Sequence, residues 1–283
     1  VTLTGFNYTP AGDEAAGFLN YGSGKDGTLT IAGCQFSANE EQVSDNESRL
    51  DIASIIADNT FDKAAYLDGG NAIYSSIQAA VDAASDGDTI NVAAGTYQEA
   101  ITLNKPNLTV KSIDGASNTI IDVPNGNLTT GVKVLANMGE VTFEGFTVKN
   151  FTEGGIIQGM SAGNGTKFHV VNNVLQPYDG YLRNGIEVSG DGSTVTGNTI
   201  SSAYLTTDWA STAISVVDAS NVTVDGNIIN GAGDYGINAY TWSVPSVSNV
   251  TISNNTVTGI DVPLAVIAYN NGTVSGATLR NNK

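Results

Sequence analysis

Tyrosine, tryptophan and aspartate residues recur together in the second half of the chain, in short polar segments spaced about 27 residues apart. Aromatic rings that stack on sugar faces, beside carboxylates that accept hydrogen bonds from hydroxyls, are typical of a saccharide-binding surface. The alternative interpretation is that the rings cover an exposed wall and the aspartates cap turns. The candidate ligand-binding residues are Tyr178, Asp179, Tyr181, Arg183, Tyr204, Asp208, Trp209, Asp234, Tyr235 and Trp242.

The same segments also allow a catalytic interpretation. Elimination from an acidic polysaccharide needs a base, an acid, and carboxylates that hold Ca²⁺ against the substrate carboxyl group. Arg183 would be the base and Tyr181 the acid, with Asp208 in the next segment. The non-catalytic interpretation assigns no catalytic residue and requires no cofactor, although its aspartates are compatible with Ca²⁺. Neither interpretation names a metal ligand.

An eight-residue pattern identifies the elements that must position these segments. It begins at residues 1, 29, 54, 141, 168, 193, 222, 250 and 277, as in STVTGNTI and VTVDGNII. Internal periods of this length indicate stacked units, each of which buries its apolar face only against its neighbours. The copies at residues 54–61 and 141–148 are separated by a longer stretch that contains a different element.

The pattern also indicates the kind of solenoid. Val and Ile alternate with polar residues, which predicts half-buried strands, and a small residue or Asn then makes a tight corner. We therefore predict an all-β, right-handed parallel β-helix with three walls and about 27 residues per turn. The corner residues Asn173, Asn198, Asn227, Asn255 and Asn282 are predicted to form an internal ladder.

A second family of strands lies between the corner copies and supplies another wall. Its members are predicted at residues 155–157, 185–188, 213–216, 236–239 and 264–267. The Tyr and Asp segments precede these strands, so they are expected to project from one edge of the prism, about 4.8 Å apart from rung to rung.

Residues 75–84 predict one short amphipathic helix, with Ser75 or Ser76 as its N-cap and Ile77, Ala80 and Val81 on its apolar face. The stretch SSIQAAVDAASDGDTINVAAGTYQEAITLNKPNLTVKSIDGASNTIID, residues 75–122, resembles the N-terminal entry of pectin-lyase-like β-helix proteins, among them pectin methylesterases and surface-protein β-helices. This resemblance implies that the helix caps the open end of the solenoid. It divides the chain into a main β-helix at residues 69–283 and rungs at residues 1–68 that end, or pack beside, a β-helix.

The catalytic motifs of the related enzymes are absent from the sequence. The chain contains no Gln-Asp, Arg-Pro or Asp-Asp pair, and its single histidine, His169, lies in a strand copy. Similarity to these enzymes therefore implies the fold and not their activity. The lone Cys34 occupies a corner and is expected to be a small buried residue.

Charge and the two ends complete the interpretation. A net charge of −17 disfavours nucleic acid and anionic membranes as partners, and no apolar run long enough for a membrane span is present. The chain starts in a strand copy, so we expect no signal peptide. Both ends are expected to be uncapped, either because the chain is a piece of a longer protein or because open solenoid ends self-associate.

These observations predict an extracellular or cell-surface protein, a structural or adhesive β-helix module that assembles end to end and contacts a polysaccharide or cell-surface glycan. The alternative is an acidic-polysaccharide lyase, or a related carbohydrate-active enzyme, that uses Tyr181, Arg183 and Asp208.

Overall fold

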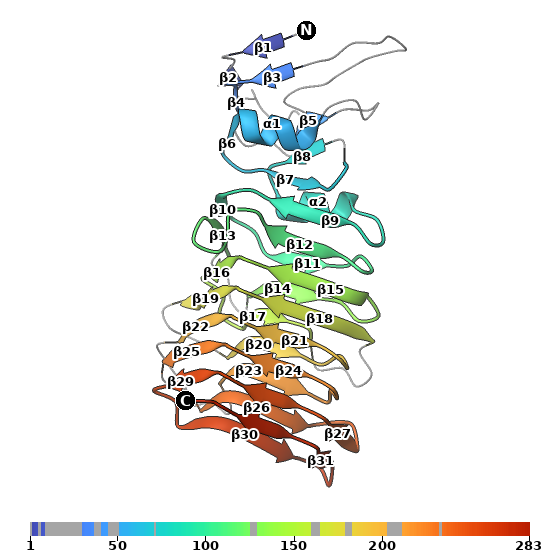
Figure 1. The fold of residues 1–283 in the computed structure, drawn as a ribbon, viewed down its shortest axis with the longest axis vertical. Helices are drawn as coiled ribbons and strands as arrows, with labels where there is room; N and C mark the ends of the chain where they lie inside the picture. Colours follow the sequence, from blue (N-terminus) through green and yellow to red (C-terminus); the bar gives the residue numbers. More distant parts are fainter. Residues whose placement is uncertain are drawn as a thin grey trace.

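A computed structural model describes residues 2–4, 7–8, 30–36, 41–44, 51–70, 72–124, 129–159, 165–178, 183–202, 211–231 and 234–283. The described strands stack as rungs along the long axis of the molecule (Figure 1). Three long sheets run side by side along the stack and form the walls of a prism. This architecture confirms the predicted all-β parallel solenoid.

From β9 onward, the strands of the three walls pair with one another in parallel. The first wall contains β9 (Thr89–Val92), β12 (Thr109–Ser112), β15 (Gly139–Glu144), β18 (Thr166–Val171), β21 (Thr194–Thr196), β24 (Thr223–Asp225), β28 (Thr251–Ser253) and β32 (Thr278–Arg280). The second wall contains β10 (Gly95–Tyr97), β13 (Thr119–Asp122), β16 (Thr147–Lys149), β19 (Val174–Gln176), β22 (Thr199–Ser202), β25 (Ile228–Gly231) and β29 (Thr256–Thr258). The third wall contains β11 (Ile101–Leu103), β14 (Thr130–Val134), β17 (Gly154–Ile157), β20 (Asn184–Val188), β23 (Thr212–Val217), β26 (Tyr235–Thr241) and β30 (Val262–Ala268). The third wall is the predicted second family of strands.

The predicted asparagine ladder runs along the corner between the first and second walls. Asn173 Nδ2 donates to Asn198 Oδ1 at 3.1 Å, Asn198 to Asn227 at 3.0 Å, Asn227 to Asn255 at 2.9 Å and Asn255 to Asn282 at 2.9 Å. The left-handed residue of each corner is the one before the ladder asparagine, such as Gly226 with φ 65°. The corner asparagines are therefore required for their amides rather than for an unusual backbone angle.

Alternating Val, Ile and Phe side chains from all three walls fill the prism. Val195, Ile200 and Ile214 are fully buried within one apolar core that extends along the stack. Phe143 and Phe146, which flank a corner, stack at a ring distance of 4.5 Å. Because each rung buries its apolar side chains against the next, burial of apolar area stabilises the stack one rung at a time.

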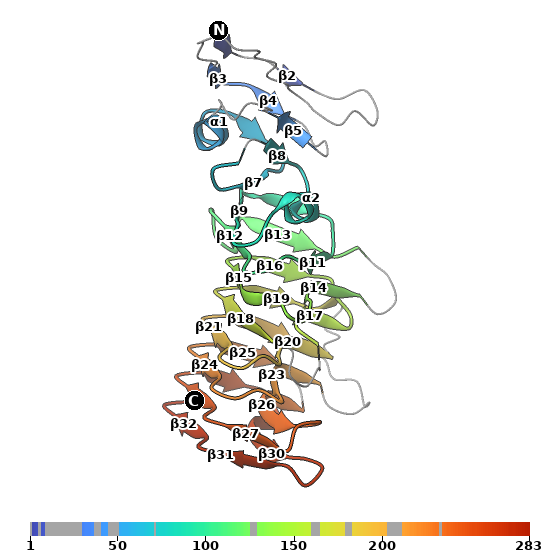
Figure 2. The same cartoon turned by 90° about the vertical axis from the view of Figure 1, so that its right-hand side faces the viewer.

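The predicted helix is α2 (Ile77–Ala83), and it packs against β9 and β11 at one end of the main stack (Figure 2). Ser76 is its N-cap and accepts a hydrogen bond from Ala79 N at 3.2 Å. The Glu99 carboxylate accepts from Ser76 Oγ, Ile77 N and Gln78 N at 2.8, 2.7 and 2.9 Å. An anion at a helix N-terminus satisfies amide groups that have no partner inside the helix.

A second helix, α1 (Ile52–Asp58), corrects the strand copy predicted to begin at Ser54. Asp51 caps this helix and accepts from Ser54 N at 3.2 Å, while Ile52 and Ile55 are buried at helical spacing. Asn59 nevertheless occupies a corner position, because its Oδ1 accepts from Cys34 N at 2.9 Å. The sixth position of this pattern copy is therefore a corner residue, as in the later copies, but a helix and not a strand precedes it.

Short strands at the N-terminal end extend the prism beyond β9 (Figure 1). They are β1 (Thr2–Thr4), β2 (Asn7–Tyr8), β3 (Thr30–Ala32), β4 (Gln35–Phe36), β5 (Glu41–Ser44), β6 (Thr60–Phe61), β7 (Ala65–Leu67) and β8 (Ala72–Tyr74). β1 and β3 are parallel, as are β2, β4 and β6, whereas β7 joins the first wall antiparallel to β9.

Cys34 is buried, as expected. The division between residues 68 and 69 stays a prediction. Neither described helix is long and apolar enough to cross a membrane.

Candidate functional site

Half of the predicted ligand-binding residues lie outside the described residues. These are Asp179, Tyr181, Tyr204, Asp208 and Trp209. The structure places the other five, Tyr178, Arg183, Asp234, Tyr235 and Trp242, around the third wall or on the approach to it. Tyr178 is exposed, and its backbone amide donates to Phe151 O at 3.0 Å.

Arg183 and Asp234 share one edge of the third wall, at the start of its strands. The register pairs Asn184 with Thr212, Thr212 with Tyr235 and Tyr235 with Val262, so the residues that precede them stack in the order Arg183, Ser211, Asp234 and Asp261. Ser211 N donates to Asp234 Oδ2 at 3.3 Å. Arg183 Nη1 lies 3.5 Å from Glu153 Oε1, in a pair that is largely exposed to solvent.

Trp242 lies at the opposite edge of the third wall, because it follows β26 whereas Asp234 precedes it. Its ring is 52% exposed and meets the Tyr269 ring edge-on at 6.2 Å. Tyr269 also packs edge-on against Tyr240 at 5.8 Å. We call Tyr240, Trp242 and Tyr269 the aromatic cluster.

Asp218 fixes the turn that carries Trp242. Its carboxylate accepts hydrogen bonds from the backbone amides of Trp242, Ser243 and Val244, and from Ser243 Oγ at 2.6 Å. Burial acts to raise the pKa of Asp218, but these hydrogen bonds outweigh it and hold that pKa below its usual range. The Trp242 ring is therefore exposed on a backbone turn that is held in place.

Three polar side chains occupy the centre of the outer face of the third wall. Glu187, Ser215 and Asn238 are register partners on β20, β23 and β26, and they alternate with inward residues such as Ile186. Glu187 is 3% exposed and Asn238 is 4% exposed. The flanking positions of this column are more open, since Ile157 and Ala265 are both half-buried. Burial on the outer face is thus confined to the middle rungs of the column.

The buried carboxyl group has altered acid-base properties. Burial raises the pKa of Glu187 to about 7, against a smaller lowering by the charge of Arg183. Asn184 Nδ2 donates to Glu187 Oε2 at 3.2 Å. Burial, together with the charges of Glu187 and Asp218, raises the pKa of Tyr240 to about 12. The outer face therefore combines a carboxyl group that titrates near neutrality with a phenol that stays protonated.

Asn238 is the polar group that the fold leaves unused. Among the residues that the structure describes, none donates a hydrogen bond to its buried Oδ1 atom. Tyr240 follows two residues later on the same strand and points to the same face, which links Asn238 to the aromatic cluster. We call Glu187, Ser215, Asn238 and the aromatic cluster the third-wall site.

The polar centre of this site was not predicted from the sequence, although the polar side chains themselves follow a visible pattern. The third residue in each of the segments that begin at Gly185, Ala213 and Gly236 is polar, as Glu187, Ser215 and Asn238. An outward position that is polar in neighbouring rungs is ordinary for a solvated wall, so this pattern does not predict that the position is buried.

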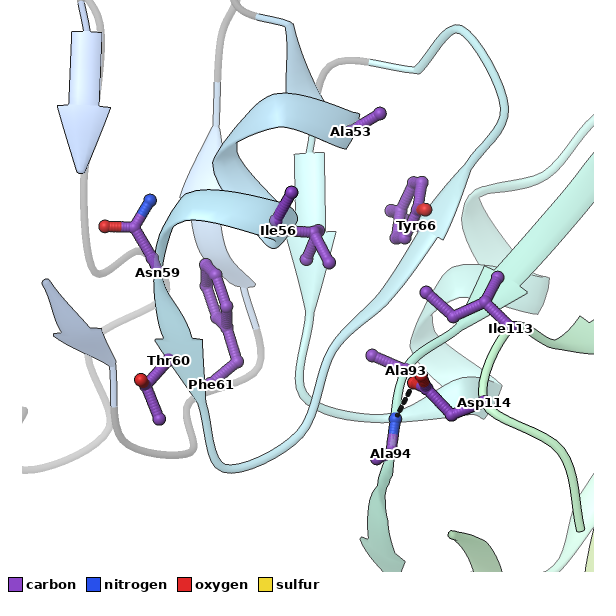
Figure 3. Close-up of a pocket in the computed structure, with 11 residues that line it drawn as sticks. Ala53, Ile56, Asn59, Thr60, Phe61, Tyr66, Ala93, Ala94, Ile113 and Asp114 are labelled. Atoms are coloured by element: carbon purple, nitrogen blue, oxygen red, sulfur yellow. Dashed lines mark hydrogen bonds between the residues drawn. The ribbon is translucent and has the colours of Figure 1, made fainter. Parts of the chain in front are cut away.

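A separate cavity of about 440 Å³ lies between α1 and the main stack (Figure 3). Ile56 from α1 faces it from one side, and Tyr66 and Ile113 from the other. Two of its polar side chains already have partners, since Asn59 Nδ2 donates to Ile31 O and Ile55 O, and Asp114 Oδ2 accepts from Ala94 N. The cavity lies outside the third wall and contains none of the predicted ligand-binding residues.

The described residues contain no group of three or more His, Cys, Asp or Glu side chains that could hold a metal ion. His169 lies on β18, where its Nδ1 is 2.7 Å from Thr194 Oγ1 and its Nε2 is 3.0 Å from Glu140 Oε1. This is the wall position expected for it.

Comparison with known proteins identifies the fold family. Residues 130–283, more than half of the chain, match the family described as right handed beta helix region, and the chain belongs to that family. This confirms the predicted handedness and agrees with the pectin-lyase-like resemblance of residues 75–122. One solved structure with a similar chain path is pectin methylesterase PemA from Erwinia chrysanthemi, at 10% identity and a TM-score of 0.36, covering 66% of this chain and 76% of that one. No curated protein matches the sequence.

Proposed function

We propose that this protein is an extracellular or cell-surface β-helix that contacts a glycan through the third-wall site. The observation that carries the proposal is the exposed Trp242, which contacts Tyr269 and is held by Asp218 at the edge of the wall whose outer face carries the buried polar groups Glu187 and Asn238. Flat rings next to a few oriented polar groups suit pyranose units, which present both C–H faces and hydroxyls.

Binding measurements with a matched pair of variants test this proposal. Trp242→Ala is expected to abolish or strongly weaken retention of the protein on immobilised polysaccharides and glycan arrays. Ile228→Ala is the control, because Ile228 is a similarly exposed apolar residue (44% against 52% for Trp242) that lies on the second wall. Equal retention of both variants, at the wild-type level, would refute the aromatic cluster as the contact surface.

A structural or adhesive role through end-to-end association is the second part of the proposal. Leu279, on β32, is 47% exposed and would lie in such a contact. Exposed strand edges beside exposed apolar side chains favour pairing with another copy. Leu279→Lys is expected to shift the sedimentation of any oligomer toward monomer, and an unchanged distribution of oligomers would refute this contact.

An acidic-polysaccharide lyase is the competing proposal, and Arg183 beside the third-wall site is the observation that favours it. Its proposed base, Arg183, pairs with Glu153 at 3.5 Å in the structure described, so substrate would have to displace that partner. A lyase would also need bound Ca²⁺ or another group to offset the substrate carboxylate. Ultraviolet absorbance of unsaturated uronate products, with and without Ca²⁺, tests this activity on pectate and alginate.

A further inference from the structure

The centre of the outer face of the third wall is buried, unlike an ordinary solvated face. Glu187 and Asn238 are both more than nine-tenths buried, although they point away from the core, and Ser215 between them is also buried. Buried polar groups in folded proteins are almost always paired. Asn238 Oδ1 departs from this rule among the described residues, so its side chain is positioned for a partner that the fold does not supply.

The chemistry of the missing partner follows from the two side chains. An amide offers one face that accepts and one that donates hydrogen bonds, and a protonated carboxyl group offers the same pair. A hydroxyl group both donates and accepts, so it satisfies the buried amide in either orientation. A hydroxyl group also pairs with Glu187 without adding a charge to the third-wall site.

A ligand with a carboxylate group is less suited to the third-wall site than a neutral one. The charge that acts on Glu187 is that of Arg183, which directly precedes β20. The phenol of Tyr240, on β26, is close enough to be affected by the charge of Glu187. The Arg183 guanidinium is already paired with Glu153. The protein as a whole carries a net charge of −17. Among the described residues, a ligand carboxylate near Glu187 would gain a counter-charge only by displacing Glu153 from Arg183, which makes its binding less favourable than that of a neutral group.

We propose that Glu187, Ser215 and Asn238 form a subsite for a hydroxyl group of an uncharged sugar unit, so that the third-wall site selects neutral polysaccharides over polyuronates. This inference rests on the proposed glycan contact and specifies its ligand class. The aromatic cluster supplies stacking, and the buried column supplies selection by charge.

Asn238→Leu gives the sharpest test, because leucine has nearly the shape of asparagine but cannot form hydrogen bonds. Replacing an unpaired buried amide by an apolar group should leave the free protein as stable as wild type or more stable. Binding of a neutral polysaccharide should weaken about tenfold, as expected for the loss of one hydrogen bond to a ligand hydroxyl. A residue needed only for the fold would behave in the opposite way, with lower stability.

Ile228→Ala, on the second wall and outside the third-wall site, is the matched control and should bind neutral glycans as the wild-type protein does. Titration calorimetry with neutral glucans and galactans, and with polygalacturonate and alginate, measures the selection. The expected result is binding of neutral chains only. Preferential binding of a polyuronate, or unchanged binding by Asn238→Leu, would overturn the subsite.

The two proposals fail in different ways. If Trp242→Ala loses binding while Asn238→Leu does not, the glycan contact holds and the subsite is wrong. If the wild-type protein binds polyuronates through Trp242, the contact again holds and the charge selection is wrong. If no polysaccharide binds the wild-type protein, both proposals are wrong.

Discussion

Asn227→Ala should destabilise the protein far more than the loss of an ordinary surface amide. Asn227 is fully buried in the corner ladder, where its Nδ2 donates to Val195 O at 2.9 Å and its Oδ1 accepts from Asn198 N at 2.9 Å. Alanine removes these two bonds together with the ladder bonds to Asn198 and Asn255, and it leaves the Val195 carbonyl group and the Asn198 amide group without these partners. At about 1–3 kcal/mol for each such group, the expected loss in free energy of unfolding is about 2–6 kcal/mol.

Urea unfolding followed by circular dichroism measures this loss, with Asn230→Ala as the control. Asn230 lies three residues further along the same rung, is exposed, and accepts only from Thr258 Oγ1 at 2.8 Å. Its replacement should change the free energy of unfolding by less than about 1 kcal/mol. The slope of the denaturant dependence should be unchanged in both variants, because neither alters the area exposed on unfolding.

The ladder interpretation would be refuted if the two variants lost similar stability. Such a result would mean that the stacked amides are replaced by water, or by relaxation of the corner, at little cost. An intermediate loss confined to one transition of a multistep unfolding curve would instead show that rungs unfold in separate groups, as stacked repeats can.

Three further predictions concern single side chains. Hydrogen bonds lower the pKa of Asp218 in the folded protein, so its stabilising effect should be present above the ordinary carboxyl pKa and lost as pH falls through the folded pKa. Asp218→Asn should cost about 1–2 kcal/mol in free energy of unfolding at neutral pH. Unfolding curves of this variant should also lack the dependence on acid pH. Burial raises the pKa of Glu187, which lies near Arg183 and Tyr240, to about 7, so its effect on stability has the opposite pH dependence. The free energy of unfolding should fall by up to about 3 kcal/mol as pH rises from about 4.5 to 7. Glu187→Gln should make the free energy of unfolding less dependent on pH in this range. Glu99→Gln should cost about 1–3 kcal/mol in urea unfolding, since the amide cannot accept all three bonds at the start of α2, and an unchanged midpoint would contradict that role.

The wall strands and the ladder could be predicted because each position repeats along the chain. Asn198 and Asn227 recur in the same sequence context and make the same contacts in successive rungs. Helix α1 could not be predicted in the same way, because Ile52 and Ile55 sit in a run too short to distinguish a helical from a strand period. The Asp51 cap was the available signal for it.

The candidate site was predictable only in part, for a geometric reason. Register alone places Arg183 and Asp234 at one edge of the third wall, as the spacing predicted. Trp242 follows its strand and so lies at the other edge, next to Tyr269. Burial of Glu187 depends on what covers the outer face, and strand alternation carries no information about that cover.

The contrast between the two buried polar columns separates the demands of the fold from those of a ligand. In the corner column the same residue type, asparagine, returns in five successive rungs and every amide is bonded to its neighbour. A solenoid can repeat one residue type along a buried polar column because the side chain has the same surroundings in every rung. On the outer face, Glu187, Ser215 and Asn238 occupy equivalent positions with three different chemistries, and one atom remains unpaired. Departures from local consistency concentrate at functional sites, and a column that does not repeat within a repeating fold is such a departure.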